Sequence, residues 1–119
     1  MGDYLGTHVL LDFYGCTQDL NNPEEIEALL IAAAVKAHTN VLHSYAHKFS
    51  PQGVSCVVVI SESHLSIHTW PEYKQAQLDI FTCGNNALPT LAVDYLQKKL
   101  NPERDVIHRQ KRGEICHTK

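Results

Sequence analysis

The sequence of 119 residues lacks the features of several large protein classes. It contains no run of 18 apolar residues, so we expect no transmembrane helix and no membrane partner. It also lacks an excess of positive charge: the formal net charge is −3 at pH 7, so we expect no nucleic-acid partner. No G-x-S-x-G motif is present, and its absence argues against a serine hydrolase.

The sequence has no C-x-x-C spacing either, although it contains four cysteines, Cys16, Cys56, Cys83 and Cys116. Its first residues lack the charged-then-apolar order of a signal peptide. Together these observations predict free thiols in a reducing compartment, and therefore a cytoplasmic protein.

The hydrophobic pattern predicts one domain over residues 1–119, with strands at 7–14, 40–49, 54–60, 64–70, 76–82 and 104–108. Helices are predicted at 24–38, after an Asn22-Pro23 start, and at 89–100. This β-α-β-β-β-β-α-β order predicts an α+β fold, a two-layer sandwich of a mostly antiparallel sheet with helices on one face.

Residues 54–60 are apolar on both strand faces apart from Ser55, so we expect a strand that is covered on both sides. The two predicted helices account for one face of the sheet only. A second copy is the simplest cover for the other face, and it would give a four-layer α/β/β/α dimer.

The histidines are numerous, eight in all, but their spacing does not predict a metal site. His43 and His47 are four residues apart, as are His64 and His68, and each pair falls on a predicted strand. Positions four apart on a strand are about 13 Å apart, too far to share one ion. We therefore expect no metal. A nucleophilic Cys83 paired with His68 stays open as an alternative.

The central stretch SESHLSIHTWPEY, residues 61–73, is the most distinctive motif of the chain. Together with the preceding PQGVSCVVVI and the following LDIFTCG, it resembles the bacterial pyruvoyl-dependent S-adenosylmethionine decarboxylases. The resemblance runs from Leu5-Gly6 and His8 to Arg112-Gly113. It implies decarboxylation of S-adenosylmethionine, which makes the aminopropyl donor for spermidine, by a homodimer with active sites between its protomers.

The resemblance also implies that the chain makes its own electrophile. Decarboxylation of an amino acid leaves a carbanion, which many enzymes stabilise with pyridoxal phosphate, but this chain has no glycine-rich phosphate cradle. In the family, the equivalent of Ser63 Oγ attacks the carbonyl of Glu62 and converts the peptide into an ester. Elimination then splits the chain, and hydrolysis of the resulting dehydroalanine releases ammonia, which leaves a piece 1–62 and a piece 63–119 that begins with a pyruvoyl group.

The resemblance assigns roles to further residues. His68 matches the histidine that carries a proton during processing, and Ser55 matches the serine that holds the oxyanion. Cys83 matches the acid that protonates the product carbon. Phe49 matches a position that stacks on adenine, and Glu72 matches an acid that binds the ribose hydroxyls. Trp70 either contacts the substrate or packs the pocket wall.

A few residues depart from the family pattern. Thr7 stands where Arg or Lys is usual, Cys56 stands where Gly is usual, and Lys74-Gln75 replaces Gly-Tyr. Gln77 replaces a small residue. These departures leave two alternatives open: a pyruvoyl-dependent decarboxylase of arginine or ornithine, and an unprocessed partner protein that is not an enzyme.

Overall fold

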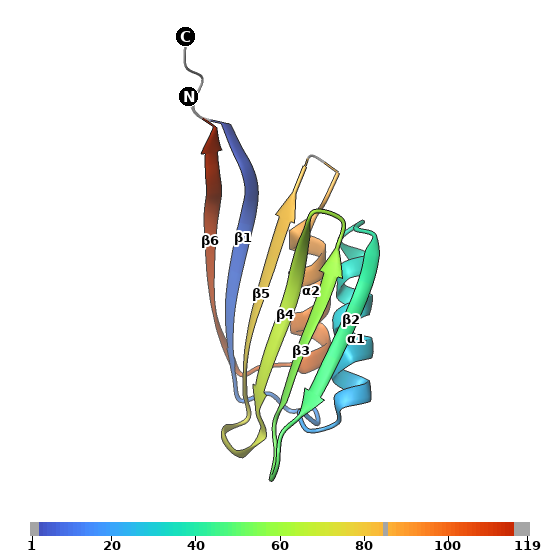
Figure 1. Ribbon diagram of the computed structural model, residues 1–119. Coiled ribbons are helices and arrows are strands. Elements are labelled where there is room, and N and C mark those ends of the chain that lie inside the picture. The colour runs from blue at the N-terminus through green and yellow to red at the C-terminus, as the bar shows by residue number, and fades with distance from the viewer. Residues whose placement is uncertain (1–2, 85, 116–119) are drawn as a thin grey trace.

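The computed structural model describes residues 3–84 and 86–115, and it confirms the predicted order of elements. In chain order these are β1 (Asp3–Tyr14), α1 (Pro23–Lys36), β2 (Val41–Lys48), β3 (Val54–Ile60), β4 (Ser63–Trp70), the short 3-10 helix η1 (Pro71–Tyr73), β5 (Gln75–Cys83), α2 (Pro89–Leu100) and β6 (Arg104–Ile115). Figure 1 shows the strands in one sheet with both helices on the same side, which confirms the predicted α+β class.

The sheet has the strand order β2-β3-β4-β5-β1-β6, and every neighbouring pair is antiparallel. The consecutive strands β2 to β5 form a meander. The first strand, β1, then lies between β5 and the last strand, β6. As a result, the central motif on β4 is flanked by β3 on one side and β5 on the other.

The covered face of the sheet carries the hydrophobic core. Helix α1 begins as predicted: Asn22 Oδ1 accepts a hydrogen bond of 3.1 Å from the Glu25 backbone N–H, and Pro23 occupies the first turn. The helices bury an apolar stripe against alternate residues of the strands. These buried residues are Ile26, Leu30, Ala33, Ala92 and Leu96 on the helices, and Phe13, Val58, Leu65, Ile67 and Ile80 on the strands.

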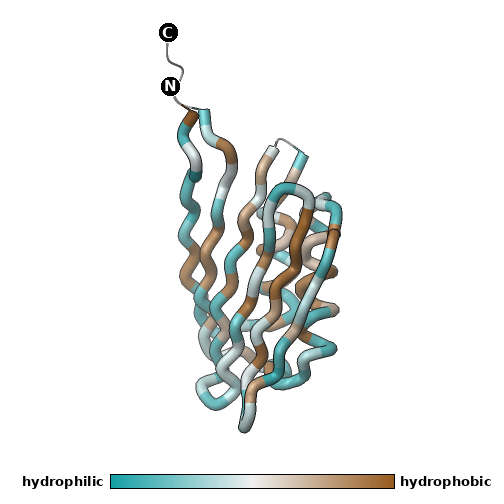
Figure 2. Tube along the Cα trace, in the orientation of Figure 1, coloured by the Kyte–Doolittle hydropathy of each residue, from teal (hydrophilic) through white to brown (hydrophobic). Residues whose placement is uncertain are grey.

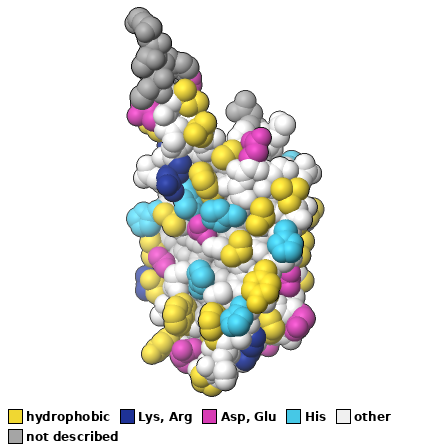
Figure 3. Space-filling view, viewed as in Figure 1, with side chains coloured by type: hydrophobic (Ala, Val, Ile, Leu, Met, Phe, Trp, Pro, Cys, Tyr) yellow, Lys and Arg dark blue, Asp and Glu magenta, His cyan; other side chains and the backbone are white. Residues whose placement is uncertain are grey.

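The open face of the sheet is partly apolar. Val57 and Val59 on β3 are 41% and 39% exposed, so a single chain covers this strand on one side only, and its cover on the other side by a second copy stays a prediction. Figure 2 shows the apolar colour running along β3, and Figure 3 shows hydrophobic side chains mixed with histidines on the face that the helices leave uncovered. Tyr45 on β2 and Trp70 on β4 are also exposed.

Two strands are longer than predicted. β1 begins at Asp3 and β6 ends at Ile115, and the two pair with each other along their whole length. They extend beyond the other strands as a two-stranded ribbon (Figure 1). The C-terminal part of β6 is exposed on both faces. Its residues therefore lack the alternation of apolar and polar side chains from which a strand is predicted.

Within the part of the chain that the structure describes, neither helix is long and apolar enough to cross a membrane.

Candidate active site

The Glu62–Ser63 peptide bond lies at a strained turn. Ile60 pairs with Ser63 across β3 and β4, so Ser61 and Glu62 form a two-residue link between the strands. Glu62 has a φ of 70°, in the left-handed region that favours glycine. For a residue with a side chain this conformation costs about 1–2 kcal/mol. The bond on which the sequence motif centres therefore comes directly after a strained residue.

The hydroxyl of Ser63 is buried without a hydrogen bond. It is the single buried side-chain polar atom among residues 3–84 and 86–115 that has no partner. Burying a hydroxyl in this way costs about 1–3 kcal/mol. The hydroxyl thus contributes nothing to stability at this position, which favours a chemical role for it.

Ser55 and His68 lie side by side. They are partners in the register of β3 and β4, and Ser55 Oγ is 2.7 Å from His68 Nδ1. His68 is exposed on the open face, where alternation also places His64 and Ser66. The arrangement joins a hydroxyl to a proton carrier on the accessible side of the sheet.

The predicted catalytic residues are divided between two ends of the sheet. His68 lies five positions after Ser63 on β4, which corresponds to about 16 Å at the usual rise of a strand. Because His64 pairs with Phe81, the register places Ser63 level with Thr82, next to Cys83. His68 pairs instead with Gln77, so the alternative in which Cys83 is paired with His68 is wrong within one chain.

The predicted substrate-binding residues lie at the His68 end. Phe49 comes directly after β2, its backbone N–H donates to the Gly53 carbonyl at 2.8 Å, and its ring meets that of His47 edge-on at 4.6 Å. Trp70 ends β4, and its Nε1 donates to Gln77 Oε1 at 2.6 Å. Glu72 is exposed in η1, directly after β4. Both exposed rings therefore sit far from Ser63 of the same chain.

A shallow depression on the open face connects the two ends. It has a volume of about 630 Å³ and runs along β4 with walls from β3 and β5. Its lining residues are Val57, Val59, Glu62, Ser63, His64, Ser66, His68 and Phe81. The depression is wide open to solvent, and its floor combines valines with histidines.

A carboxylate beneath this depression was missed at the sequence level. Asp79 on β5 accepts hydrogen bonds from His8 Nε2 at 2.7 Å, from His64 Nε2 at 3.1 Å and from the Ser66 hydroxyl. Arg112 on β6 donates to the other nitrogen of His8, Nδ1, at 2.7 Å. The residues come from four strands and are up to 104 positions apart, so only the strand order could have revealed the cluster.

The protonation of this cluster is set by its hydrogen bonds. Burial alone raises the pKa of Asp79, but the hydrogen bonds from Ser66, His8 and His64 outweigh it, and the pKa of the carboxyl is lowered. The guanidinium of Arg112 can only donate, so His8 Nδ1 accepts and His8 Nε2 carries the proton.

The ligand atoms of His8, His64 and Asp79 lie within 4.8 Å of one another, the spacing of a metal site. A metal ion would need the lone pair of His8 Nε2. With Arg112 donating to Nδ1, the Nε2 nitrogen carries the proton, so the cluster is arranged as a hydrogen-bond network.

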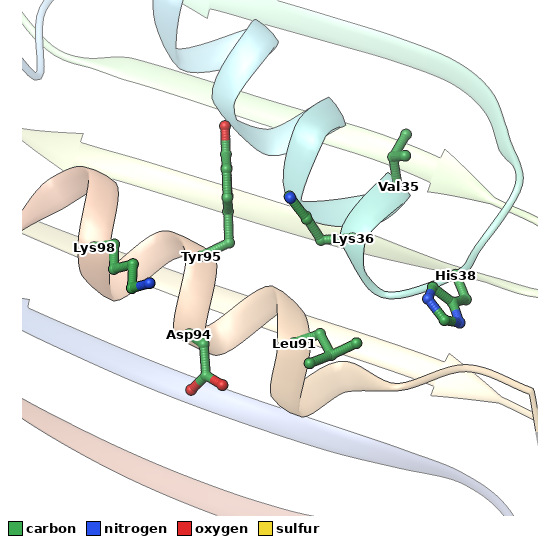
Figure 4. Close-up of a pocket in the computed structure, with 7 residues that line it drawn as sticks. All are labelled: Val35, Lys36, His38, Leu91, Asp94, Tyr95 and Lys98. Atoms are coloured by element: carbon green, nitrogen blue, oxygen red, sulfur yellow. The ribbon is translucent and has the colours of Figure 1, made fainter.

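A second depression, of about 590 Å³, lies on the opposite side of the molecule between the two helices. Figure 4 shows Val35, Lys36 and His38 from α1 and its C-terminal end facing Leu91, Asp94, Tyr95 and Lys98 of α2. None of the predicted site residues lines it.

Comparison with known proteins decides the family. A family model described as S-adenosylmethionine decarboxylase matches residues 7–113. The chain belongs to the S-adenosylmethionine decarboxylase family.

Curated relatives of the decarboxylase family align over almost the whole chain. An S-adenosylmethionine decarboxylase proenzyme of Pelotomaculum thermopropionicum is 47% identical over 97% of this chain and 92% of its own length. One of Clostridium tetani is 48% identical over 92% of this chain and 87% of its own length. The crystal structure of the adenosylmethionine decarboxylase from Aquifex aeolicus superposes with a TM-score of 0.90 at 36% identity, covering 98% of both chains. These names give no support to the arginine or ornithine alternative.

The residues that depart from the decarboxylase pattern occupy different places in the fold. Lys74 has a φ of 54°, so the lysine occupies a left-handed conformation in which the family's glycine would be unstrained. Gln77 holds the Trp70 indole, and Thr7 lies opposite Lys111 in the β1–β6 register. Cys56 is buried in the core, and burial raises the pKa of its thiol to about 12. Cys116 lies outside the described residues.

Proposed function

We propose that this protein is a pyruvoyl-dependent decarboxylase that removes carbon dioxide from S-adenosylmethionine and so supplies the aminopropyl donor for spermidine. The observation that carries the proposal is the Ser63 hydroxyl, which is buried without a partner directly after the strained Glu62. The names of the relatives support the substrate, and the word proenzyme in those names supports a chain that must be processed.

Processing divides the chain into residues 1–62 and 63–119 in this proposal. Ser63 Oγ attacks the Glu62 carbonyl carbon, and the C–N bond between the two residues breaks as the ester forms. Loss of the Ser63 α-proton then breaks the Cβ–O bond of the ester and releases the Glu62 carboxylate, and hydrolysis of the resulting dehydroalanine by water releases ammonia and leaves a pyruvoyl group at the start of the second piece. The residues fit such a group, since Ser63 is buried and unpaired and the left-handed turn at Glu62 favours opening of the bond. The pyruvoyl carbonyl supplies the electron sink that amino acid decarboxylation requires.

A homodimer would complete each active site. Proton transfer requires contact within about 3 Å, yet Ser63 and His68 of one chain lie about 16 Å apart along β4. A two-fold axis that lies between two stacked sheets, parallel to them and perpendicular to β4 at its middle, would exchange these ends. It would bring the Ser55–His68 pair of a second copy to Ser63 and Cys83, and it would cover the exposed Val57 and Val59.

The same two-fold arrangement would place the substrate. Phe49, Trp70 and Glu72 share an end with His68, so those of the second copy would also approach Ser63. Aromatic faces stabilise adenine by stacking and attract the cationic sulfonium, and a carboxylate accepts hydrogen bonds from ribose hydroxyls. Cys83 would protonate the product carbon. The reaction uses neither pyridoxal phosphate nor a metal ion in this mechanism.

A location in the cytoplasm also belongs to the proposal. Cys16, Cys56 and Cys83 are free thiols, and burial raises the pKa of Cys16 to about 11, so this thiol packs as a neutral group. Free buried thiols are typical of proteins in a reducing compartment.

Mass spectrometry of the denatured protein tests the processing. We expect two pieces that divide after Glu62, with the second piece lighter by one ammonia than a chain that starts with serine. A single intact chain would contradict the proposal and favour a partner protein that is not an enzyme. Carbon dioxide release from S-adenosylmethionine, arginine and ornithine then tests the substrate, and release from either of the last two alone would contradict it.

A further inference from the structure

The Asp79 network supports three of the side chains that line the depression beside Ser63. Asp79 holds His64 and Ser66 directly, and both side chains line the depression. His8, the third donor to Asp79, stacks on Phe81 with ring centroids 5.0 Å apart and an angle of 27°. Asp79 therefore positions much of the surface that a substrate at Ser63 would meet.

The two histidines that hydrogen-bond to Asp79 differ in whether a ring nitrogen remains without a hydrogen bond. Both nitrogens of His8 are engaged, Nε2 by Asp79 and Nδ1 by Arg112. His64 donates through Nε2 to Asp79, so its Nδ1 keeps a lone pair in the neutral form. No hydrogen bond from a described residue occupies this Nδ1. The His64 side chain is 38% exposed and lines the depression.

An amino acid substrate must lose a proton from its α-ammonium group before it can react beside Ser63. Its α-amino group is largely protonated at neutral pH, because α-amino groups titrate at about pH 8. A protonated amine has no lone pair with which to react at a carbonyl. A base beside Ser63 is therefore required, and His68 and Cys83 already have other roles.

We infer that His64 is this base: its Nδ1 takes one proton from the α-ammonium of the substrate, and Asp79 positions it for the transfer. One N–H bond of the ammonium breaks and one Nδ1–H bond forms, so His64 becomes an imidazolium that the Asp79 carboxylate stabilises. Asp79 plays the part of the carboxylate that fixes the tautomer of a catalytic histidine in serine proteases. The inference rests on the proposed function.

Several ionisable groups surround His64. Glu62 and His68 flank it along the β3–β4 hairpin, His8 approaches from β1, Asp79 from β5 and Arg112 from β6. Asp79 is the group among these that hydrogen-bonds to His64. The His8 ring is edge-on to it at 6.1 Å. Asp79 is thus the group that holds the His64 ring in place.

The test compares three variants, His64→Gln, Asp79→Asn and the control His38→Asn, whose site lies on the helix side. Carbon dioxide release from S-adenosylmethionine is measured at pH 7 and pH 9, and hydroxylamine labelling of the cleaved protein is followed by mass. Hydroxylamine is already unprotonated at neutral pH, so it needs no base. We expect His64→Gln to lose about tenfold in turnover at pH 7, to regain most of it at pH 9, and to keep the parent labelling rate.

The outcomes separate the role of His64 from the proposed function. A parent protein that is not labelled by hydroxylamine would refute the proposed function, and the inference would fall with it. With a labelled parent, the inference is overturned if His64→Gln retains full turnover at pH 7, if it loses labelling as well, or if it is no longer cleaved. The last result would assign His64 to processing instead.

A spectroscopic measurement tests the tautomer independently of turnover. In the uncleaved Ser63→Ala protein, ¹⁵N chemical shifts should show the His64 proton on Nε2. Asp79→Asn offers an amide N–H in place of a carboxylate oxygen, so the proton should move toward Nδ1, and turnover of the cleavable protein should fall with it. A His64 proton found on Nδ1 in the parent network would contradict the inference.

Discussion

Ser55 Oγ lies 2.7 Å from His68 Nδ1, and this pair faces solvent about 16 Å from the Ser63 of its own chain. The pair is thus assembled before any partner binds. The pair is expected to act at Ser63, which is too far away within the same chain. Whether it acts on Ser63 of its own chain or of a second chain is therefore a question for experiment.

Mixed dimers answer that question. We expect Ser63→Ala and His68→Ala to remain uncleaved when each is expressed alone. In a co-expressed mixture the His68→Ala chain, which keeps Ser63, should be cleaved because His68 comes from the Ser63→Ala chain. Mass spectrometry of tagged chains identifies which chain is cut. Failure of the His68→Ala chain to be cleaved in verified mixed dimers would refute a shared site.

The unpaired hydroxyl predicts a gain in stability when it is removed. In the uncleaved His68→Ala protein, adding Ser63→Ala should raise the free energy of unfolding by about 1–2 kcal/mol, because a buried hydroxyl without a partner is lost. Urea unfolding at one fixed protein concentration measures the change. Ser61→Ala, which removes an exposed hydroxyl two residues earlier, is the matched control and should change little. A loss of stability for Ser63→Ala would mean that the hydroxyl has a partner.

The left-handed turn predicts an effect of glycine on cleavage. Glu62→Gly removes the side chain that makes a φ of 70° unfavourable. The free energy of unfolding of the uncleaved chain should therefore rise by about 1 kcal/mol. If that strain favours opening of the bond, cleavage should slow about fivefold. The time course of cleavage after synthesis measures the rate. Glu62→Gln keeps the strain and removes only the charge; it should cleave at the parent rate, and equal rates for both variants would exclude a role for strain.

Gly6 predicts a steric limit beside Cys83. A Cβ at Gly6 would lie 2.5 Å from the Thr82 carbonyl oxygen and 3.0 Å from Cys83 Sγ. The first contact is with backbone, so Gly6→Ala should destabilise the fold by about 1–3 kcal/mol. Gly84→Ala meets no atom within 4 Å, but it has a φ of 85° and should cost only the backbone strain. Urea unfolding compares them, and a Gly6→Ala protein as stable as the parent would contradict the packing.

The lowered pKa of Asp79 predicts the pH dependence of stability. A carboxyl whose pKa is lower in the folded state contributes stability above its unfolded value of about 3.9, and this contribution is lost as the pH falls through the folded value. In the uncleaved protein, Asp79→Asn should therefore reduce the free energy of unfolding at pH 6 more than at pH 3. Urea unfolding of both proteins across this range measures the difference. A constant difference would show that the network does not hold the carboxyl ionised.

The sequence predicted the order of elements because the apolar residues that face the core recur at regular spacing, as Leu65 and Ile67 do on β4. It did not predict the length of β6, whose exposed residues beyond His108 carry no such period. The strand predicted over residues 64–70 already separates Ser63 from His68, because each residue of a strand adds about 3.3 Å. Finding Asp79 with His8 required knowing that β1 inserts beside β5.

The insertion of β1 determines how the two pieces stay associated once the chain is cut after Glu62. Residues before that bond form β1, β2 and β3, and residues after it form β4, β5 and β6. In the sheet, β1 is clasped between β5 and β6, while β3 borders β4. Each fragment is thus incomplete without the other, and the nicked chain would remain a single folded body until a denaturant melts the whole sheet.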